Sequence, residues 1–268
     1  MLIILKLTLL IILTVPGRAF KILCYGDSLT YGWSNGGREE TPYAPVLQQA
    51  LATRGVEATV RHWGGPGKTA RELVDPALGG PNGANGLVTL LRKCKGFSPG
   101  ASLPLLCVIM IGTNDLAQVG LGSTADSIYS DIENMHELAK GEGAKTLAVT
   151  LPGSGMAERF PEAEKARVAV NERIRSDLDT DIFEFPFPYS DGDERWDPDG
   201  LHFSPYGYEA LGVALADPIL DLVLEEDKPF DGMSCGAFKM QQLKGGDQQR
   251  RIAKFLAERQ GEKYSEKD

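Results

Sequence analysis

Short apolar runs alternate with longer amphipathic stretches along most of this chain. The apolar runs predict strands at Lys21–Tyr25, Ala58–Trp63, Leu105–Ile111, Thr146–Thr150 and Ile182–Phe185. The stretches between them predict helices over residues 43–54, 84–94, 124–140 and 159–178. Alternation of strands and helices predicts a parallel sheet with helices on both faces, and therefore an α/β fold.

The ends of the chain differ in composition from its middle. Residues 1–19 combine one lysine, a short apolar core and small residues before a possible cleavage point, which predicts a secretory signal peptide. The alternatives are that residues 1–19 form an uncleaved signal anchor, or that the start of the coding sequence is misassigned. Residues 20–226 then form one predicted domain, and residues 227–268 a charged C-terminal extension whose last helix is either solvated or binds a partner. We expect a secreted protein with no stable membrane insertion after signal removal.

The net charge and the positions of the cysteines argue against some classes of function. The net charge of −9 argues against a nucleic-acid partner. Cys24 and Cys107 lie in apolar runs and are expected in the core, whereas Cys94 and Cys235 could pair after export. Neither a CxxC motif nor a Cys/His cluster occurs, so we expect no metal site.

The first predicted strand ends in a small polar motif. In KILCYGDSLTYGW, residues 21–33, the apolar run breaks into Gly-Asp-Ser, so Ser28 follows the strand directly. Ligands of open parallel sheets bind at the carboxyl ends of the strands, which is where this hydroxyl lies. Alone, the motif is equally typical of a turn.

A base for Ser28 must come from three histidines. His136 is expected at the margin of the packed face of a helix, while His62 ends the second strand and could fall near Ser28. His202 lies in a loop just before a predicted helix, with Asp199 three positions earlier. Asp199 could hold one ring nitrogen and leave the other for Ser28, as in acyl transfer. A turn aspartate beside a surface histidine is the alternative.

Two further strand ends supply candidate donors for an oxyanion. Asn114 follows the strand in MIGTNDL, and an uncharged side-chain donor there suits a developing negative charge. Gly67 follows the second strand in WGGPGKTA and could offer its backbone N–H to a substrate. Each residue alone could be a strand-end cap or a plain turn.

These segments, in this chain order, resemble the four blocks of the SGNH/GDSL hydrolases over about residues 21–223: Gly26-Asp27-Ser28-Leu29, Gly67 in its Gly-rich loop, Gly112-Thr113-Asn114-Asp115 and Asp199-x-x-His202. The resemblance implies a flavodoxin-like, three-layer α/β/α sandwich with about five parallel strands. It also implies Ser28 as nucleophile, His202 as base and Asp199 as its partner. The Ser28 N–H, the Gly67 N–H and the Asn114 side chain would form the oxyanion hole, with no cofactor.

Within that family, LCYGDSLTYGW and the Asn-Gly-Ala of residues 82–84 look most similar to the arylesterase and acyltransferase branch. His62 departs from the Asn that many members carry there, which could alter hydrogen bonding near Gly67. Asp27 and Asp115 are expected to tie loops together rather than react. Four aromatic residues near the motifs could line a substrate pocket or only pack: Tyr31, Trp33, Trp63 and Trp196.

The expected function is ester hydrolysis through an acyl-enzyme, with short-chain or acetyl esters, including acetylated sugars, as substrates. Lipase-like, thioesterase-like or acyltransferase activity on longer chains is the alternative within the family. A secreted, non-catalytic binding module is an alternative of another class. A nucleotide-binding protein is disfavoured because GGPGKTA lacks the first glycine of a phosphate loop, where His62 stands instead.

Overall fold

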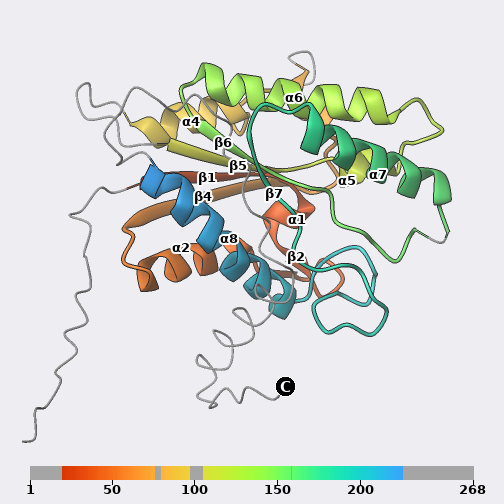
Figure 1. Cartoon of the computed structure of the whole chain (residues 1–268). Helices are drawn as coiled ribbons and strands as arrows, with labels where there is room; N and C mark the ends of the chain where they lie inside the picture. Colours follow the sequence, from red (N-terminus) through yellow and green to blue (C-terminus); the bar gives the residue numbers. More distant parts are fainter. Residues whose placement is uncertain (1–19, 76–79, 97–104, 158, 226–268) are drawn as a thin grey trace, which may run out of the picture.

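The computed structural model describes residues 20–75, 80–96, 105–157 and 159–225 (Figure 1). The predicted signal peptide, the C-terminal extension and Cys235 lie outside these residues, so all three stay predictions. Within the described ranges, no helix has the length and apolar character needed to cross a membrane.

A five-stranded parallel sheet lies at the centre of the described fold, in the order β4-β1-β5-β6-β7. Its strands are β1 (Phe20–Asp27), β4 (Ala58–Gly65), β5 (Leu105–Met110), β6 (Lys145–Val149) and β7 (Asp181–Phe183). All five correspond to predicted strands. A small antiparallel hairpin of β2 (Trp33–Ser34) and β3 (Glu39–Glu40) was not predicted.

Helices cover both faces of this sheet, which confirms the predicted three-layer α/β/α sandwich. The longer helices are α2 (Tyr43–Thr53), α4 (Leu87–Lys95), α6 (Ala125–Gly141), α7 (Pro161–Ser176) and α8 (Pro205–Glu225). Three short helices follow β1, β4 and β5: α1 (Ser28–Tyr31), α3 (Ala70–Val74) and α5 (Thr113–Leu116). Figure 1 shows α2 and α8 on one side of the sheet and α4 and α6 on the other.

The core consists of two apolar clusters separated by the sheet. Along β1, Ile22 and Cys24 face the cluster under α2 and α8, whereas Leu23 and Tyr25 face the cluster under α4 and α6. Burial on both faces explains why β1 is a continuous apolar run rather than an alternating one. Each fully buried aliphatic side chain contributes about 1.5–3 kcal/mol relative to exposure. The described cysteines are buried free thiols: Cys24, Cys94 and Cys107.

The structure corrects the expected position of one histidine. His136 was placed at the margin of the packed face of α6, but it is fully buried. Neither ring nitrogen has a hydrogen-bond partner among the described residues. Burial lowers the pKa of His136 to about 3, with a smaller effect of Lys140, so the folded protein holds a neutral ring.

Candidate active site

Ser28 occupies the junction between β1 and α1, at the carboxyl edge of the sheet. The strand approaches β5 so closely here that a Cβ at Gly26 would lie 1.9 Å from the Met110 carbonyl oxygen, which only glycine avoids. Asp27 then caps α1, because its carboxylate accepts the Leu29 N–H at 2.9 Å. The turn leaves Ser28 nearly buried, at 5% exposure.

The structure brings the three predicted triad residues into one hydrogen-bonded chain. His202 Nε2 lies 2.9 Å from Ser28 Oγ, and His202 Nδ1 lies 2.6 Å from Asp199 Oδ2. A carboxylate only accepts hydrogen bonds, so Nδ1 carries the ring hydrogen and Nε2 is left to accept the hydroxyl proton. This arrangement can transfer a proton from Ser28 to His202.

The loop between β7 and α8 holds Asp199 in place through backbone bonds. Its Oδ1 accepts the N–H groups of Leu201 at 2.8 Å and His202 at 2.9 Å. Burial acts to raise the pKa of Asp199, but the His202 ring and these two N–H groups outweigh it and hold the pKa below its usual value. Asp199 is therefore ionised at neutral pH.

Trp33 packs against the imidazole of His202. The two rings meet edge to face with centroids 5.6 Å apart. Tyr208 of α8 donates its hydroxyl hydrogen to the Trp33 carbonyl oxygen at 2.8 Å, and the Gly36 N–H donates to Asp197 Oδ2 at 3.2 Å. These two bonds tie the β2–β3 hairpin to the segment that carries His202.

The predicted oxyanion donors follow three adjacent strands, β4, β1 and β5, and Ser28 follows the central one. Gly67 follows β4 with a φ of +75°, a backbone conformation that favours glycine, and it is exposed. Asn114 lies in α5, and its Nδ2 donates to the Lys68 carbonyl oxygen at 2.9 Å. An amide nitrogen has two hydrogens, so one stays free for a substrate oxygen.

Asp27 and Asp115, which are expected from the sequence to tie loops together, are both buried. Asp27 is fully buried, and its Oδ2 has no hydrogen-bond partner among the described residues. Burial raises the pKa of Asp27 to about 7 and that of Asp115 to about 6. Asp115 Oδ2 accepts the Ala70 N–H at 2.8 Å, which joins the loop after β5 to the loop after β4.

The other residues considered near the motifs serve the core of the fold. His62 lies opposite Cys24 in the β1–β4 register, and burial lowers its pKa. Trp63 stacks on Tyr25 with ring centroids 5.0 Å apart, and Trp196 is buried in an aromatic cluster. Only Trp33 among the tryptophans contacts a triad residue in the described structure.

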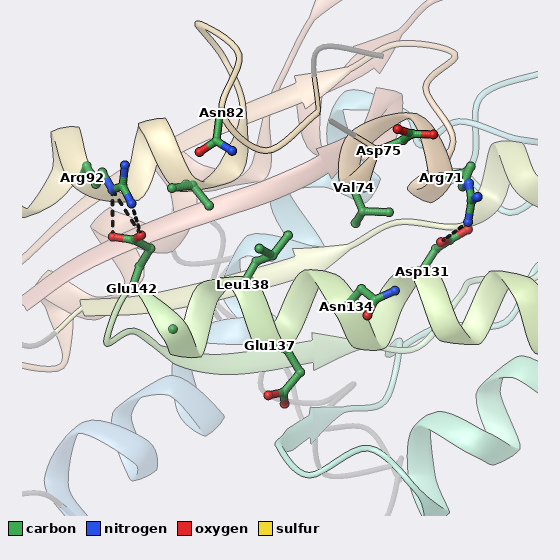
Figure 2. A pocket seen from close by; sticks show the side chains of 12 residues that line it. Arg71, Val74, Asp75, Asn82, Arg92, Asp131, Asn134, Glu137, Leu138 and Glu142 are labelled. Atoms are coloured by element: carbon green, nitrogen blue, oxygen red, sulfur yellow. Dashed lines mark hydrogen bonds and ion pairs between the residues drawn. The ribbon is translucent and has the colours of Figure 1, made fainter. Parts of the chain in front are cut away.

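Two large cavities lie away from the triad. A groove of about 730 Å³ runs between α3, α4 and α6, where Arg71 pairs with Asp131 and Arg92 with Glu142 (Figure 2). A second cavity of about 810 Å³ lies between the loops that follow β6 and β7. Ser28, Asp199 and His202 line neither of them. Within the described residues, no group of three or more His, Cys, Asp and Glu could hold a metal ion.

Comparisons with known proteins bear on the family and the fold. The model of the GDSL-like lipase/acylhydrolase family matches residues 24–210. A lipase/acylhydrolase structure from Enterococcus faecalis is similar, with 24% identity, a TM-score of 0.55, and 75% of this chain and 96% of that chain covered. A carbohydrate acetylesterase family member from Sinorhizobium meliloti has 24% identity and a TM-score of 0.53, covering 76% and 99%. Among curated proteins, none matches this sequence.

Proposed function

Because the chain belongs to the GDSL-like lipase/acylhydrolase family and is a carboxylic ester hydrolase, we propose that it acts through a Ser28–His202–Asp199 triad. The observation that carries the proposal is the unbroken contact from Ser28 Oγ through the His202 ring to the Asp199 carboxylate. In the first step, His202 Nε2 takes the hydroxyl proton while Oγ bonds to the acyl carbon.

The negative charge that develops on the carbonyl oxygen needs donors already in place. The proposal assigns this role to the backbone N–H groups of Ser28 and Gly67 and to the free amide hydrogen of Asn114. Collapse of the tetrahedral intermediate breaks the bond to the alcohol oxygen, which leaves with the proton held by His202. Water then attacks the acyl-Ser28 ester, with His202 as base, and releases the carboxylic acid.

We propose short-chain and acetyl esters as substrates, acetylated sugars among them. Gly67 is exposed, and Ser28, Asp199 and His202 line neither large cavity, so the proposal needs no deep channel for a small acyl group. A lipase-like or acyltransferase activity on longer chains is the second candidate. It is favoured by exposed apolar side chains in segments that follow β5 and β6, namely Leu121, Met156 and Phe160.

Labelling with a fluorophosphonate probe tests the triad. We expect the probe to modify Ser28 of the wild type and to leave Ser28→Ala unlabelled, with peptide mapping to locate the adduct. His202→Ala should label far more slowly, because no base takes the Ser28 proton. A wild-type protein that hydrolyses no ester and stays unlabelled would refute the proposal and favour the non-catalytic binding module.

A panel of p-nitrophenyl esters from acetyl to palmitoyl separates the two substrate classes. We expect kcat/KM to be highest for the acetyl and butyryl esters and to fall with chain length. A maximum at the long-chain end would favour the lipase-like candidate. Product analysis with added alcohol would then measure how far acyl transfer competes with hydrolysis.

We also propose that the protein is exported, because residues 1–19 have the composition of a signal peptide. N-terminal sequencing of the protein recovered from its native cells tests this. A mature chain that begins close to residue 20 would support export, and a chain that keeps residues 1–19 would contradict cleavage.

A further inference from the structure

We propose that Asp115 is a positioning residue, whose buried carboxylate ties the loop that carries Asn114 to the loop that carries Gly67. The inference rests on the proposed function, because it takes these two residues as oxyanion donors. Asp115 itself touches neither substrate nor Ser28. Its role is to fix the distance between donors that come from two different strands.

The inference rests on a buried hydrogen bond between two residues that are far apart in the sequence. Asp115 Oδ2 accepts the Ala70 N–H at 2.8 Å, between residues 45 positions apart. Ala70 is the first residue of α3 and follows Gly67 by only three positions. The N–H of Arg71 also faces the carboxylate and lowers its pKa, so Asp115 holds the start of α3. Movement of α3 would therefore move the Gly67 N–H.

A second bond joins the same two loops, and it cannot replace the first. Asn114 Nδ2 donates to the Lys68 carbonyl oxygen at 2.9 Å, in a solvent-exposed position. Exposed hydrogen bonds exchange with water at little cost, and the Asn114 amide must also serve the substrate. The carboxylate of Asp115 is only 2% exposed, so its bond to Ala70 has no competing water. The buried bond is the one able to set the loop spacing.

The surroundings of Asp115 are electrostatically unfavourable for an ionised carboxyl group. Burial raises its pKa to about 6, and the nearby carboxyl of Asp131 adds to that effect. The charged group that faces it from β1 is Asp27, also a carboxyl. No Lys or Arg of the described residues forms an ion pair with Asp115. A buried carboxylate without a cation is destabilising, and residues kept at such a cost are typical of functional sites.

Asp131 provides a matched control. It is also a buried aspartate beside α3, but its hydrogen bond in the described structure is to the largely exposed Arg71 side chain, at 3.3 Å, and not to a backbone N–H at the start of α3 (Figure 2). We would measure kcat and KM of Asp115→Ala and Asp131→Ala with p-nitrophenyl acetate, well below their unfolding midpoints. Active-site concentrations would come from fluorophosphonate labelling carried to completion.

We expect Asp115→Ala to lower kcat by about ten- to a hundredfold, because displaced donors stabilise the transition state less well. KM should stay close to the wild-type value, since the donors act on a charge that is absent from the bound ester. Asp131→Ala should keep the wild-type kcat although it loses stability. In an Asn114→Ala background, the Asp115→Ala loss should be smaller, because part of its effect passes through Asn114.

If Asp115→Ala does not fold, the variants Asp115→Asn and Asp131→Asn, which keep the shape of the side chain, test the inference instead. Asp115→Asn keeps one oxygen for the Ala70 N–H but turns an amide toward the Arg71 N–H, so we expect a kcat below that of Asp131→Asn. Equal kcat values for either matched pair, or a loss confined to KM, would overturn the inference while the wild type stays active. An inactive, unlabelled wild type would instead overturn the proposed function and this inference with it.

Discussion

At the scale of single residues, Asn114 is the donor whose role is most directly testable. Asn114 Nδ2 donates one amide hydrogen to the Lys68 carbonyl oxygen at 2.9 Å, and the other hydrogen remains for a substrate oxygen. We expect Asn114→Ala to lower kcat by about a hundred- to a thousandfold, the usual cost of one oxyanion donor. Circular dichroism should show an unchanged fold, and near-full activity in the folded variant would exclude the assigned role.

Trp33 supports the base rather than the nucleophile. Its ring meets the His202 imidazole edge to face, and such aromatic contacts contribute about 0.5–1.5 kcal/mol. We expect Trp33→Ala to lower kcat by about two- to tenfold, because one kcal/mol corresponds to roughly a fivefold change in rate. Trp33→Phe keeps an aromatic edge and should retain most of the activity. Equal losses in both variants would point to the shape of the indole instead.

The sequence identifies residues that the structure brings together, but not the contacts that hold them in place. Ser28, Asp199 and His202 are identifiable because chain order and spacing carry the motif, and the structure brings them together as expected. The contact between Asp115 and Ala70 depends on β4 and β5 flanking β1, which the residues near Asp115 do not encode. The contact of Trp33 with His202 likewise depends on the hairpin and α8.

At the scale of helices and strands, the burial and the length of an element decide whether it can be recognised from the sequence. β5 is apolar throughout and β1 is apolar from Ile22 to Tyr25 because both faces of these strands are covered, so both can be recognised in the sequence without knowledge of a partner strand. The helices α1, α3 and α5 span one turn or little more, too short to show a helical period. Local caps signal two of them: the Asp27 side chain at α1 and a capping box from Thr69 to Glu72 at α3.

Helix α6 carries a buried polar group that destabilises the fold. Both nitrogens of His136 lack partners among the described residues, and an unsatisfied buried polar group costs about 1–3 kcal/mol. We expect His136→Met, which fills a similar volume without polar atoms, to raise the free energy of unfolding by about that amount. Urea denaturation at neutral pH measures it. A less stable variant would reveal a hydrogen-bond partner, such as an enclosed water molecule.

The burial of His136 also predicts how the free energy of unfolding changes with pH. The pKa of His136 is lowered from 6.5 to about 3 on folding, so below pH 6.5 the unfolded chain binds a proton that the folded one does not. The free energy of unfolding should therefore fall as the pH drops from 6.5 toward 3, by about 1.4 kcal/mol per unit from this group alone. His136→Met should lose this contribution. Identical acid profiles of variant and wild type would contradict the assignment.

At the scale of the whole molecule, the site depends on one edge of one sheet. Ser28, Gly67 and Asn114, the proposed nucleophile and oxyanion donors, follow three adjacent strands, while His202, the proposed base, lies in the loop that leads into α8. Because α8 packs against α2 on the opposite side of the sheet from α6, the loop that carries His202 and the loops that carry Gly67 and Asn114 adjoin different core clusters. Both clusters must therefore be intact for the triad and the oxyanion donors to meet.

The described core is complete by the end of α8, which leads to a prediction about the domain boundaries. Leu222 and Val223 are buried in the cluster under α2 and α8, and the family match ends at residue 210. We expect a chain of residues 20–226 to fold and to hydrolyse p-nitrophenyl acetate with the kcat and unfolding midpoint of the full-length protein. Parallel assays of the two chains test this. If the shorter chain unfolds at lower temperature or loses kcat, then residues 227–268 contribute to the domain, and the predicted boundary at 226 is wrong.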